Sequence, residues 1–284
     1  MSNAATLAPV QRRLGTSRTV TACATLLAVI ALIALIGPFL VPYNYDDTDF
    51  DARFIAPTLG DFRLFGTDEL GRDLLARTLL GIQVTFFVAV IASIVSLGIG
   101  VLYGATAGFI GGRVDAVMMR TVDGLYALPF VFLVILLMVV FERNFLLIFV
   151  AIGAINWLDM ARIVRGQTIS LKHREFIDAA RLIGVSTSRI IIRHITPNLL
   201  GVVLVYLTLT IPQAILVESF LSFLGLGVQE PQTSLGALVS GGVSHMESAP
   251  WLLVVPATVL AFILFCFNFL GDGLRDLADP KQAA

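Results

Sequence analysis

Glu218 stands with Ser219 and Ser222 inside an otherwise apolar stretch of the sequence. A charged side chain at the centre of a lipid bilayer costs at least about 2.5 kcal/mol, so such residues usually face a cavity or a bonding partner. Glu218 is therefore interpreted in one of two ways. It lines a polar path or its outer gate, or it is a buried carboxylate bonded to a neighbouring helix.

The patterns by which chains hydrolyse ATP or bind catalytic metals are absent from the sequence. There is no G-x-x-x-x-G-K-[ST] run, and the two lysines, Lys172 and Lys281, follow no glycine-rich loop. The three histidines are interpreted as polar surface residues. Cys23 and Cys266 lie in apolar runs and lack the spacing of metal ligands. We expect a chain that is not itself an enzyme and that holds no metal or cofactor.

The basic residues are concentrated in one stretch of the chain, residues 160–197. Seven of the 19 Lys and Arg residues lie there: Arg162, Arg165, Lys172, Arg174, Arg181, Arg189 and Arg193. Apolar runs long enough to cross a bilayer lie on both sides. A basic loop between two membrane spans is expected in the cytoplasm, where this one should have a partner.

Within this stretch the sequence predicts two short helices. Apolar residues recur at helical spacing from 175 to 183, and Arg174 and Asp178 are placed to form an i,i+4 ion pair. Gly184 is expected to end the first helix, because glycine adopts the left-handed backbone conformation without strain. A serine or threonine at 186–187 can cap the second helix, and a proline is expected to close the unit.

A second polar run, residues 65–73, reads F-G-T-D-E-L-G-R-D. Thr67 or Asp68 can cap a helix that continues through Leu74 and Leu80, and this helix is expected to be amphipathic and to lie at the membrane interface.

The apolar run that follows contains a stripe of small residues at every fourth position. They are Ala92, Ser96, Gly100, Gly104 and Gly108. Because such a stripe lets two helix backbones approach closely in lipid, we interpret it as a packing surface.

Composition predicts an all-α polytopic membrane protein. The chain is 57% hydrophobic and 14% charged, with a mean hydropathy of +0.90, whereas soluble domains are about 45–50% apolar and about 25% charged. Six transmembrane helices are expected at 20–41, 82–107, 114–140, 145–163, 198–224 and 251–270.

The positions of the basic residues predict the organisation of the chain, with both termini in the cytoplasm. The expected parts are a cytoplasmic tail at 1–18, a first span at 19–41, an external loop with the interfacial helix at 42–81, a domain of five spans at 82–280 that includes the cytoplasmic loop 162–197, and a short tail at 281–284.

The cytoplasmic loop resembles the "EAA" loop of permease subunits in ATP-driven (ABC) importers. The resemblance rests on Asp178-Ala179-Ala180, Gly184 and Pro197, with Asp178 in place of the usual Glu. It implies the type I importer permease fold and a coupling helix that docks on a cytoplasmic ATPase. The docking residues it implies are Glu175, Asp178, Ala179, Ala180, Gly184, Ser186 and Pro197.

Further motifs are similar to those of the oligopeptide-permease "C" type subunit within this family. The run at 65–73 supplies Gly66, Thr67, Asp68, Gly71, Arg72 and Asp73 as family-motif residues. W-L-D-M-A-R-I-V-R-G-Q at 157–167, E-S-F-L-S-F-L-G-L-G at 218–227 and G-D-G-L-R-D at 271–276 extend the likeness over residues 20–280.

The resemblance implies an importer that moves oligopeptides or dipeptides by alternating access across a bacterial cytoplasmic (inner) membrane. The implied partners are a second, homologous permease, two ATPase subunits that bind ATP and Mg²⁺, an extracytoplasmic peptide-binding protein, the peptide and membrane lipid. No nucleic-acid partner is expected.

Three alternatives remain. The same scaffold can import nickel or another small solute. An ion-driven secondary transporter would show inverted repeats with broken helices and leave the EAA-like loop unexplained. An integral membrane enzyme would need clustered His, Asp or Cys at the interface, which the sequence lacks.

Overall fold

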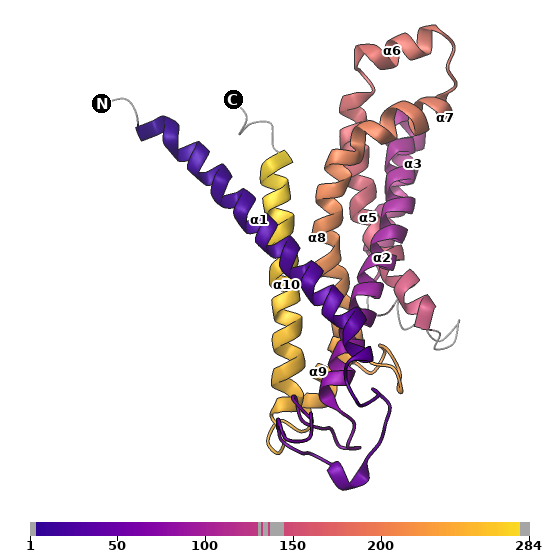
Figure 1. Cartoon of the computed structure of the whole chain (residues 1–284). Coiled ribbons are helices and arrows are strands. Elements are labelled where there is room, and N and C mark those ends of the chain that lie inside the picture. Colours follow the sequence, from indigo (N-terminus) through magenta and orange to yellow (C-terminus); the bar gives the residue numbers. More distant parts are fainter. Residues whose placement is uncertain (1–3, 130–131, 133–135, 137–144, 279–284) are drawn as a thin grey trace. The chain divides into compact units, whose positions relative to one another are not determined.

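The structure is a computed structural model that describes residues 4–129, 132, 136 and 145–278, and it is built of helices (Figure 1). The long helices are α1 (Ala4–Ile36), α2 (Leu74–Ile110), α3 (Gly112–Tyr126), α5 (Phe145–Leu171), α8 (Thr196–Phe223) and α10 (Trp251–Ala278). The short ones are α6 (Glu175–Leu182), α7 (Thr187–Ile190), α9 (Leu235–Val243), the 3-10 turns η1 (Gly37–Phe39) and η2 (Phe50–Ala52), and the π-helical η3 (Ile191–Ile195). Among these residues the β-structure is one isolated bridge between Thr67 and Asp73.

Four stretches of helix in the described part of the chain are long and apolar enough to cross a membrane. They are Arg18–Phe39, Leu74–Ile110, Thr187–Phe223 and Trp251–Asp276. The fold is therefore that of an all-helical membrane protein. The expected span at 114–140 falls partly outside the described residues, and the one at 145–163 lies within α5.

The chain divides into two compact units, and α2 and α8 contribute residues to both. Unit 1 comprises residues 1–89 and 215–284. In it α10 packs against α1 and α9. Its buried cluster at the start of α2 consists of Leu74, Leu238, Ala249 and Leu252, with Phe65, Trp251 and Val255 packed against it.

Unit 2 comprises residues 90–214, and the stripe of small residues on α2 packs there against α5. A Cβ added to Gly100 would lie 2.6 Å from Met160 Cβ, and one added to Gly104 would lie 2.3 Å from Ala161 O. The two backbones are so close that no larger side chain fits between them. This confirms the interpretation of the stripe as a packing surface.

Three helices differ in extent from the sequence prediction. α1 begins at Ala4, so the helix includes residues 4–18 of the expected N-terminal tail. α2 runs without a break from Leu74 to Ile110, so the expected interfacial helix is the first part of a longer helix. α8 begins at Thr196, two residues before the expected span, and contains Pro212.

Pro197 does not close the cytoplasmic segment as predicted, because it lies in the first turn of α8. Proline lacks an N–H, and its ring clashes with the carbonyl four residues earlier. The chain accommodates it after the π-helical turn Ile191–Ile195, in which the Thr196 amide donates to Ile191 O. Helical structure therefore continues from α7 into α8.

Candidate functional site

The predicted site residues fall into both units. Unit 2 holds Glu175, Asp178, Ala179, Ala180, Gly184, Ser186 and Pro197, and unit 1 holds Gly66, Thr67, Asp68, Gly71, Arg72, Asp73, Glu218, Ser219 and Ser222. The two groups are described separately below.

The segment between α5 and α8 turns at Gly184, as the sequence predicts. Gly184 has φ +79°. Its amide donates to Arg181 O at 3.0 Å, and the Val185 amide donates to Ala180 O at 3.0 Å. These are the paired bonds of a Schellman motif, which satisfies the last carbonyls of a helix. α6 therefore ends in a fixed turn, and Val185 packs against the core of unit 2.

α6 has one buried and one exposed face. Ile177 and Ala180 are buried in a cluster with residues of α2, α5, α7, η3 and α8. Phe176 is 42% exposed, Leu182 is 88% exposed and Ile183 is 81% exposed. Large apolar side chains gathered on the outside of a short helix are typical of an interaction surface.

The polar residues of α6 and α7 make weaker contacts than the sequence predicts. Asp178 Oδ1 accepts from Arg181 Nη1 at 3.2 Å. The prediction of an ion pair between Asp178 and Arg174 is therefore wrong. The side chains of Asp178 and Arg181 are both about half exposed, and such a pair contributes about 0–1 kcal/mol. Ser186 occupies the N-cap position of α7, but its side chain makes no capping bond. Glu175 lies in the first turn of α6, where the helix dipole favours negative charge.

In unit 1, Thr67 lies at the centre of the loop module, which we define as residues 49–73. Its hydroxyl donates to Ala52 O at 2.5 Å and accepts from the Ile55 amide at 2.8 Å. The side chain is fully buried, and its carbonyl accepts from Trp251 Nε1 at 3.3 Å. Thr67 therefore binds the module together and attaches it to the start of α10.

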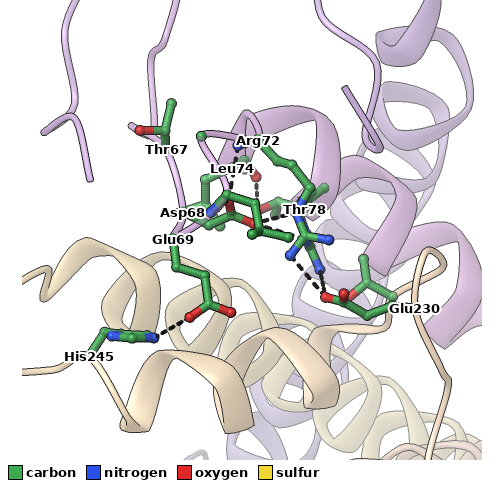
Figure 2. Close-up of polar contacts among 12 residues, drawn as sticks. Thr67, Asp68, Glu69, Arg72, Leu74, Thr78, Glu230 and His245 are labelled. Carbon is green, nitrogen blue, oxygen red and sulfur yellow. Dashed lines mark hydrogen bonds and ion pairs between the residues drawn. The ribbon is translucent and has the colours of Figure 1, made fainter. Parts of the chain in front are cut away.

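Asp68 accepts hydrogen bonds at both carboxylate oxygens (Figure 2). Oδ1 accepts from the Leu70 and Arg72 amides, each at 2.9 Å. Oδ2 accepts from Arg72 Nε at 2.7 Å and from Arg77 Nη1 at 2.8 Å. Asp68 is 8% exposed and both arginines are 5% exposed. One buried carboxylate thus faces two buried guanidinium groups, and a second anion is needed to balance their charge.

Gly66 and Gly71 form the tight turns of the module. Their φ angles are +79° and +74°. A Cβ on Gly71 would lie 1.7 Å from Asp49 O, and one on Gly66 would lie 2.5 Å from Ile55 O. Only glycine fits both the space and the left-handed backbone at these positions. The two glycines of the F-G-T-D-x-x-G-R-D run are therefore required for the loop module to fold.

Asp73 caps α2, since its Oδ1 accepts from the Ala76 amide at 2.8 Å. The prediction of a cap at Thr67 or Asp68 is wrong, because the module backbone engages Thr67 and the arginines engage Asp68. Burial raises the pKa of the Asp73 carboxyl above its ordinary value, and this outweighs the lowering by the Ala76 hydrogen bond and by Arg63.

A cleft of about 500 Å³ lies beside the two arginines. Glu230 Oε1 accepts from Arg72 Nη2 at 2.9 Å and from Arg77 Nη2 at 3.3 Å, and its side chain is 62% exposed. Elsewhere in the lining, His245 Nε2 lies 3.0 Å from Glu69 Oε2 (Figure 2). The cleft therefore combines two buried cations with a carboxylate that water can reach.

Glu218 is fully buried near the end of α8. Its Oε1 accepts from Ser222 Oγ at 2.7 Å and from Ser234 Oγ at 2.6 Å. Ser234 is the N-cap of α9 and accepts from the Ala237 amide at 3.1 Å. Glu218 Oε2 and Ser219 Oγ have no partner among the described residues. Within unit 1 the Glu218 carboxylate is therefore buried and bonded to the N-cap residue of α9.

Sequence reasoning missed Arg77 and Glu230. A charge inside the expected interfacial helix was the available signal for Arg77. Glu230 lies 158 positions from Arg72, so no local pattern links the two. Only the tertiary fold of unit 1 brings them together.

Two family descriptions match the chain. Residues 100–283 match "Binding-protein-dependent transport system inner membrane component", which is more than half of the sequence. Residues 10–57 match "N-terminal TM domain of oligopeptide transport permease C".

Several characterised proteins are similar over nearly the whole chain. The oligopeptide transport system permease protein OppC of Escherichia coli K12 is 55% identical over 96% of this chain and 90% of that protein. OppC of Haemophilus influenzae is 50% identical over 96% of this chain and 88% of that protein. The dipeptide transport system permease protein DppC of Bacillus subtilis is 42% identical over 95% of this chain and 84% of that protein.

A solved structure shares the fold. The MetNI methionine ABC transporter, in an inward-facing conformation, contains a chain that matches with a TM-score of 0.54 and 17% identity, covering 70% of this chain and 94% of that one. The fold is that of an ABC importer permease. The chain belongs to the family of binding-protein-dependent transport system inner membrane components, the non-catalytic, multi-pass permease subunits of ABC transporters, for which separate ATPase chains bind ATP.

Proposed function

We propose that the chain is the permease subunit of an importer that moves oligopeptides into the cytoplasm by alternating access. The observation that carries the proposal is the 55% identity with a protein named as an oligopeptide transport permease, over 96% of this chain. Dipeptides are the second candidate cargo, because the dipeptide permease DppC is 42% identical over 95% of the chain.

The segment from Glu175 to Pro197 is the proposed coupling element, which docks on an ATPase subunit. Its support is the exposed apolar surface of Phe176, Leu182 and Ile183, held in place by the Schellman turn at Gly184. A rigid docking element transmits a movement of the ATPase, whereas a flexible loop would absorb it.

Contacts inside unit 2 support this transmission. Ile177 shares its buried cluster with residues of α2, α5 and α8. Lys172 Nζ donates to Gly108 O at 3.1 Å, and Arg165 Nη2 donates to Asp115 Oδ2 at 2.6 Å. A force on α6 therefore reaches α2, α5 and α8 through packed side chains. The hydrogen bond of Lys172 and the ion pair of Arg165 further tie the α5 end to α2 and α3.

We further propose six spans with both termini in the cytoplasm. The complete transporter would contain a second, homologous permease, two ATPase subunits and an extracytoplasmic peptide-binding protein. The match to a binding-protein-dependent transport component supports the binding protein and the ATPase.

Glu218, Ser219 and Ser222 are proposed to belong to the outer gate. The hydrogen bond from Ser234, the N-cap of α9, to Glu218 holds the start of α9 against α8, and the bond from Ser222 lies within α8. In this proposal Glu218 positions the α8–α9 connection and does not itself contact the peptide.

The test is co-purification of the tagged chain in mild detergent, with the associated proteins identified. We expect two ATPase chains and a homologous permease. A Leu182→Ser and Ile183→Ser double variant should lose the ATPase chains and keep the second permease, because only the exposed end of α6 has changed. A Val117→Ser variant, which changes an exposed apolar residue of α3, is the matched control. A wild-type chain that purifies alone and supports ion-driven uptake would contradict the proposal.

A further inference from the structure

We propose that the cleft beside Arg72 and Arg77 is a binding site for a carboxylate supplied from outside this chain. In the structure Glu230 occupies this site. The cleft has a volume of about 500 Å³, within the range of roughly 300–1,000 Å³ that is typical of small-molecule sites. Its lining includes the apolar side chains of Val228, Leu238 and Leu252, which can hold the body of a ligand.

The two carboxylates that face the arginines differ in how firmly they are held. Asp68 is buried and uses both oxygens, with two backbone amides among its donors. Glu230 uses only Oε1 for the arginines, at 2.9 and 3.3 Å, and its side chain is 62% exposed. Exposed ion pairs are weak, so Asp68 is a fixed part of the site and Glu230 is exchangeable.

The arginines, in contrast, cannot leave the cleft. Each is 5% exposed and bound to Asp68. Arg77 Nε is buried and has no hydrogen-bond partner among the described residues. When Glu230 swings into solvent, Asp68 is the one carboxylate still bonded to the two guanidinium groups, so their combined positive charge is no longer balanced by direct partners. Guanidinium pairs bind carboxylates well, because their N–H groups match the two oxygens.

The carboxylate can come from the C-terminus of a peptide or from an acidic side chain of an extracytoplasmic protein. The site itself follows from the geometry, and only the identity of the carrier rests on the proposed function. Glu230→Gln is the informative variant, since it removes the competing charge and keeps the side chain's length. Glu247→Gln makes the same charge change at an exposed residue of the loop before α10 that does not line the cleft.

The experiment uses the full protein, with the chains that co-purify with it, in lipid nanodiscs. Binding of an N-acetylated tripeptide and of its C-terminal amide is measured by calorimetry, and binding of the purified binding protein is measured in parallel. We expect Glu230→Gln to lower the dissociation constant of one of these interactions on the order of fivefold, which corresponds to the loss of one exposed ion pair. Glu247→Gln should leave every dissociation constant unchanged. Tightening for the acid but not the amide assigns a peptide terminus. Tightening for the binding protein alone assigns an acidic side chain.

The proposal is overturned if the wild type, Glu230→Gln and Glu247→Gln all bind with equal affinity. It is also overturned if Glu247→Gln tightens binding as much as Glu230→Gln does. Peptide uptake in proteoliposomes is measured on the same preparations, so a failed site can be distinguished from a failed transport function. If Glu230→Gln does not fold, Glu230→Asp serves instead, because a side chain shorter by one methylene reaches the two guanidinium groups less well.

Discussion

Two carboxylates of the loop module, only five positions apart, have opposite surroundings. Asp68 is surrounded by four donors, two of them on guanidinium groups. Asp73 receives its cap bond from Ala76, while its second oxygen is buried and has no hydrogen-bond partner among the residues that the structure describes. The charge of Asp68 is therefore stabilised by its neighbours, whereas burial disfavours the charge of Asp73. The same substitution should have different effects at the two sites.

Asp68→Asn should destabilise the protein on the order of 3 kcal/mol, because it leaves two buried guanidinium groups with only the exposed carboxylate of Glu230 as their anion. Thermal unfolding of the purified protein in detergent measures the change. Asp61→Asn, at an exposed residue of the same module, is the matched control and should leave the melting temperature unchanged. A melting temperature for Asp68→Asn equal to that of the control would show that the buried pair contributes nothing.

Asp73→Asn should be neutral or stabilising at neutral pH, since asparagine also caps helices. The folded-state pKa of Asp73 is raised, so the native state keeps its proton after the unfolded chain has lost it. Stability therefore falls as the pH rises from the ordinary value of 3.8 through the folded pKa. Asparagine cannot ionise and lacks this fall. Between about pH 4 and about pH 8 the melting temperature of the variant should rise relative to that of the wild type. A difference in melting temperature that does not change with pH would contradict the raised pKa of Asp73.

At the scale of elements, the turn at Gly184 determines how α6 is presented. Gly184→Leu forces a non-glycine side chain into the left-handed region, at a cost of about 1–2 kcal/mol. No atom of the described part of the chain lies within 4 Å of the new Cβ, so the substitution tests the backbone conformation. We expect ATP hydrolysis to continue while peptide uptake falls, measured together in proteoliposomes. Gly184→Asn should retain uptake, because asparagine tolerates this conformation. Normal uptake by a well-expressed Gly184→Leu protein would refute a coupling role for the turn.

The packing of α2 against α5 gives a second prediction at this scale. Gly104→Val places a Cβ 2.3 Å from Ala161 O and should destabilise unit 2 by about 1–3 kcal/mol. Gly98→Val, six residues earlier on the same helix, serves as the control, because a Cβ there has no described residue within 4 Å. Both substitutions change helix propensity equally, so the difference between their melting temperatures isolates the contact. Equal values would mean that the helices separate to accept the side chain.

The sequence predicted those features that depend only on residues close together in the chain. The positive φ at Gly184 and the stripe on α2 follow from side-chain size and helical period, and both predictions are confirmed. Prediction failed where one residue had several possible roles. Thr67 and Asp68 are good caps in isolation, but tertiary partners engage them, and Asp73 caps the helix instead. The charge of Arg72 is balanced in part by Glu230, which lies 158 positions away in the sequence. Periodic sequence patterns relate only neighbouring positions, so they could not predict this contact.

At the scale of the whole molecule, the proposed six-span topology can be tested by chemical labelling. Cys23 and Cys266 are buried, and replacing them with alanine gives a background without cysteine. In intact cells a membrane-impermeant maleimide should label Asp61→Cys, and it should label Arg174→Cys only after permeabilisation. Both positions are exposed, so accessibility in the folded chain does not differ between them. Labelling of Arg174→Cys in intact cells would place the coupling segment outside and reject the topology.

The exposed end of α6 also bears on the fate of the chain in the cell. Leu182 and Ile183 are exposed in this chain, and in the proposed transporter the ATPase partner would cover them. A chain synthesised in excess of that partner displays an apolar patch to chaperones and membrane proteases, which act on such surfaces. Its lifetime is then determined by the supply of a different gene product and not by the stability of its own fold. The surface that couples transport to ATP hydrolysis would thereby also keep the subunits in stoichiometric balance.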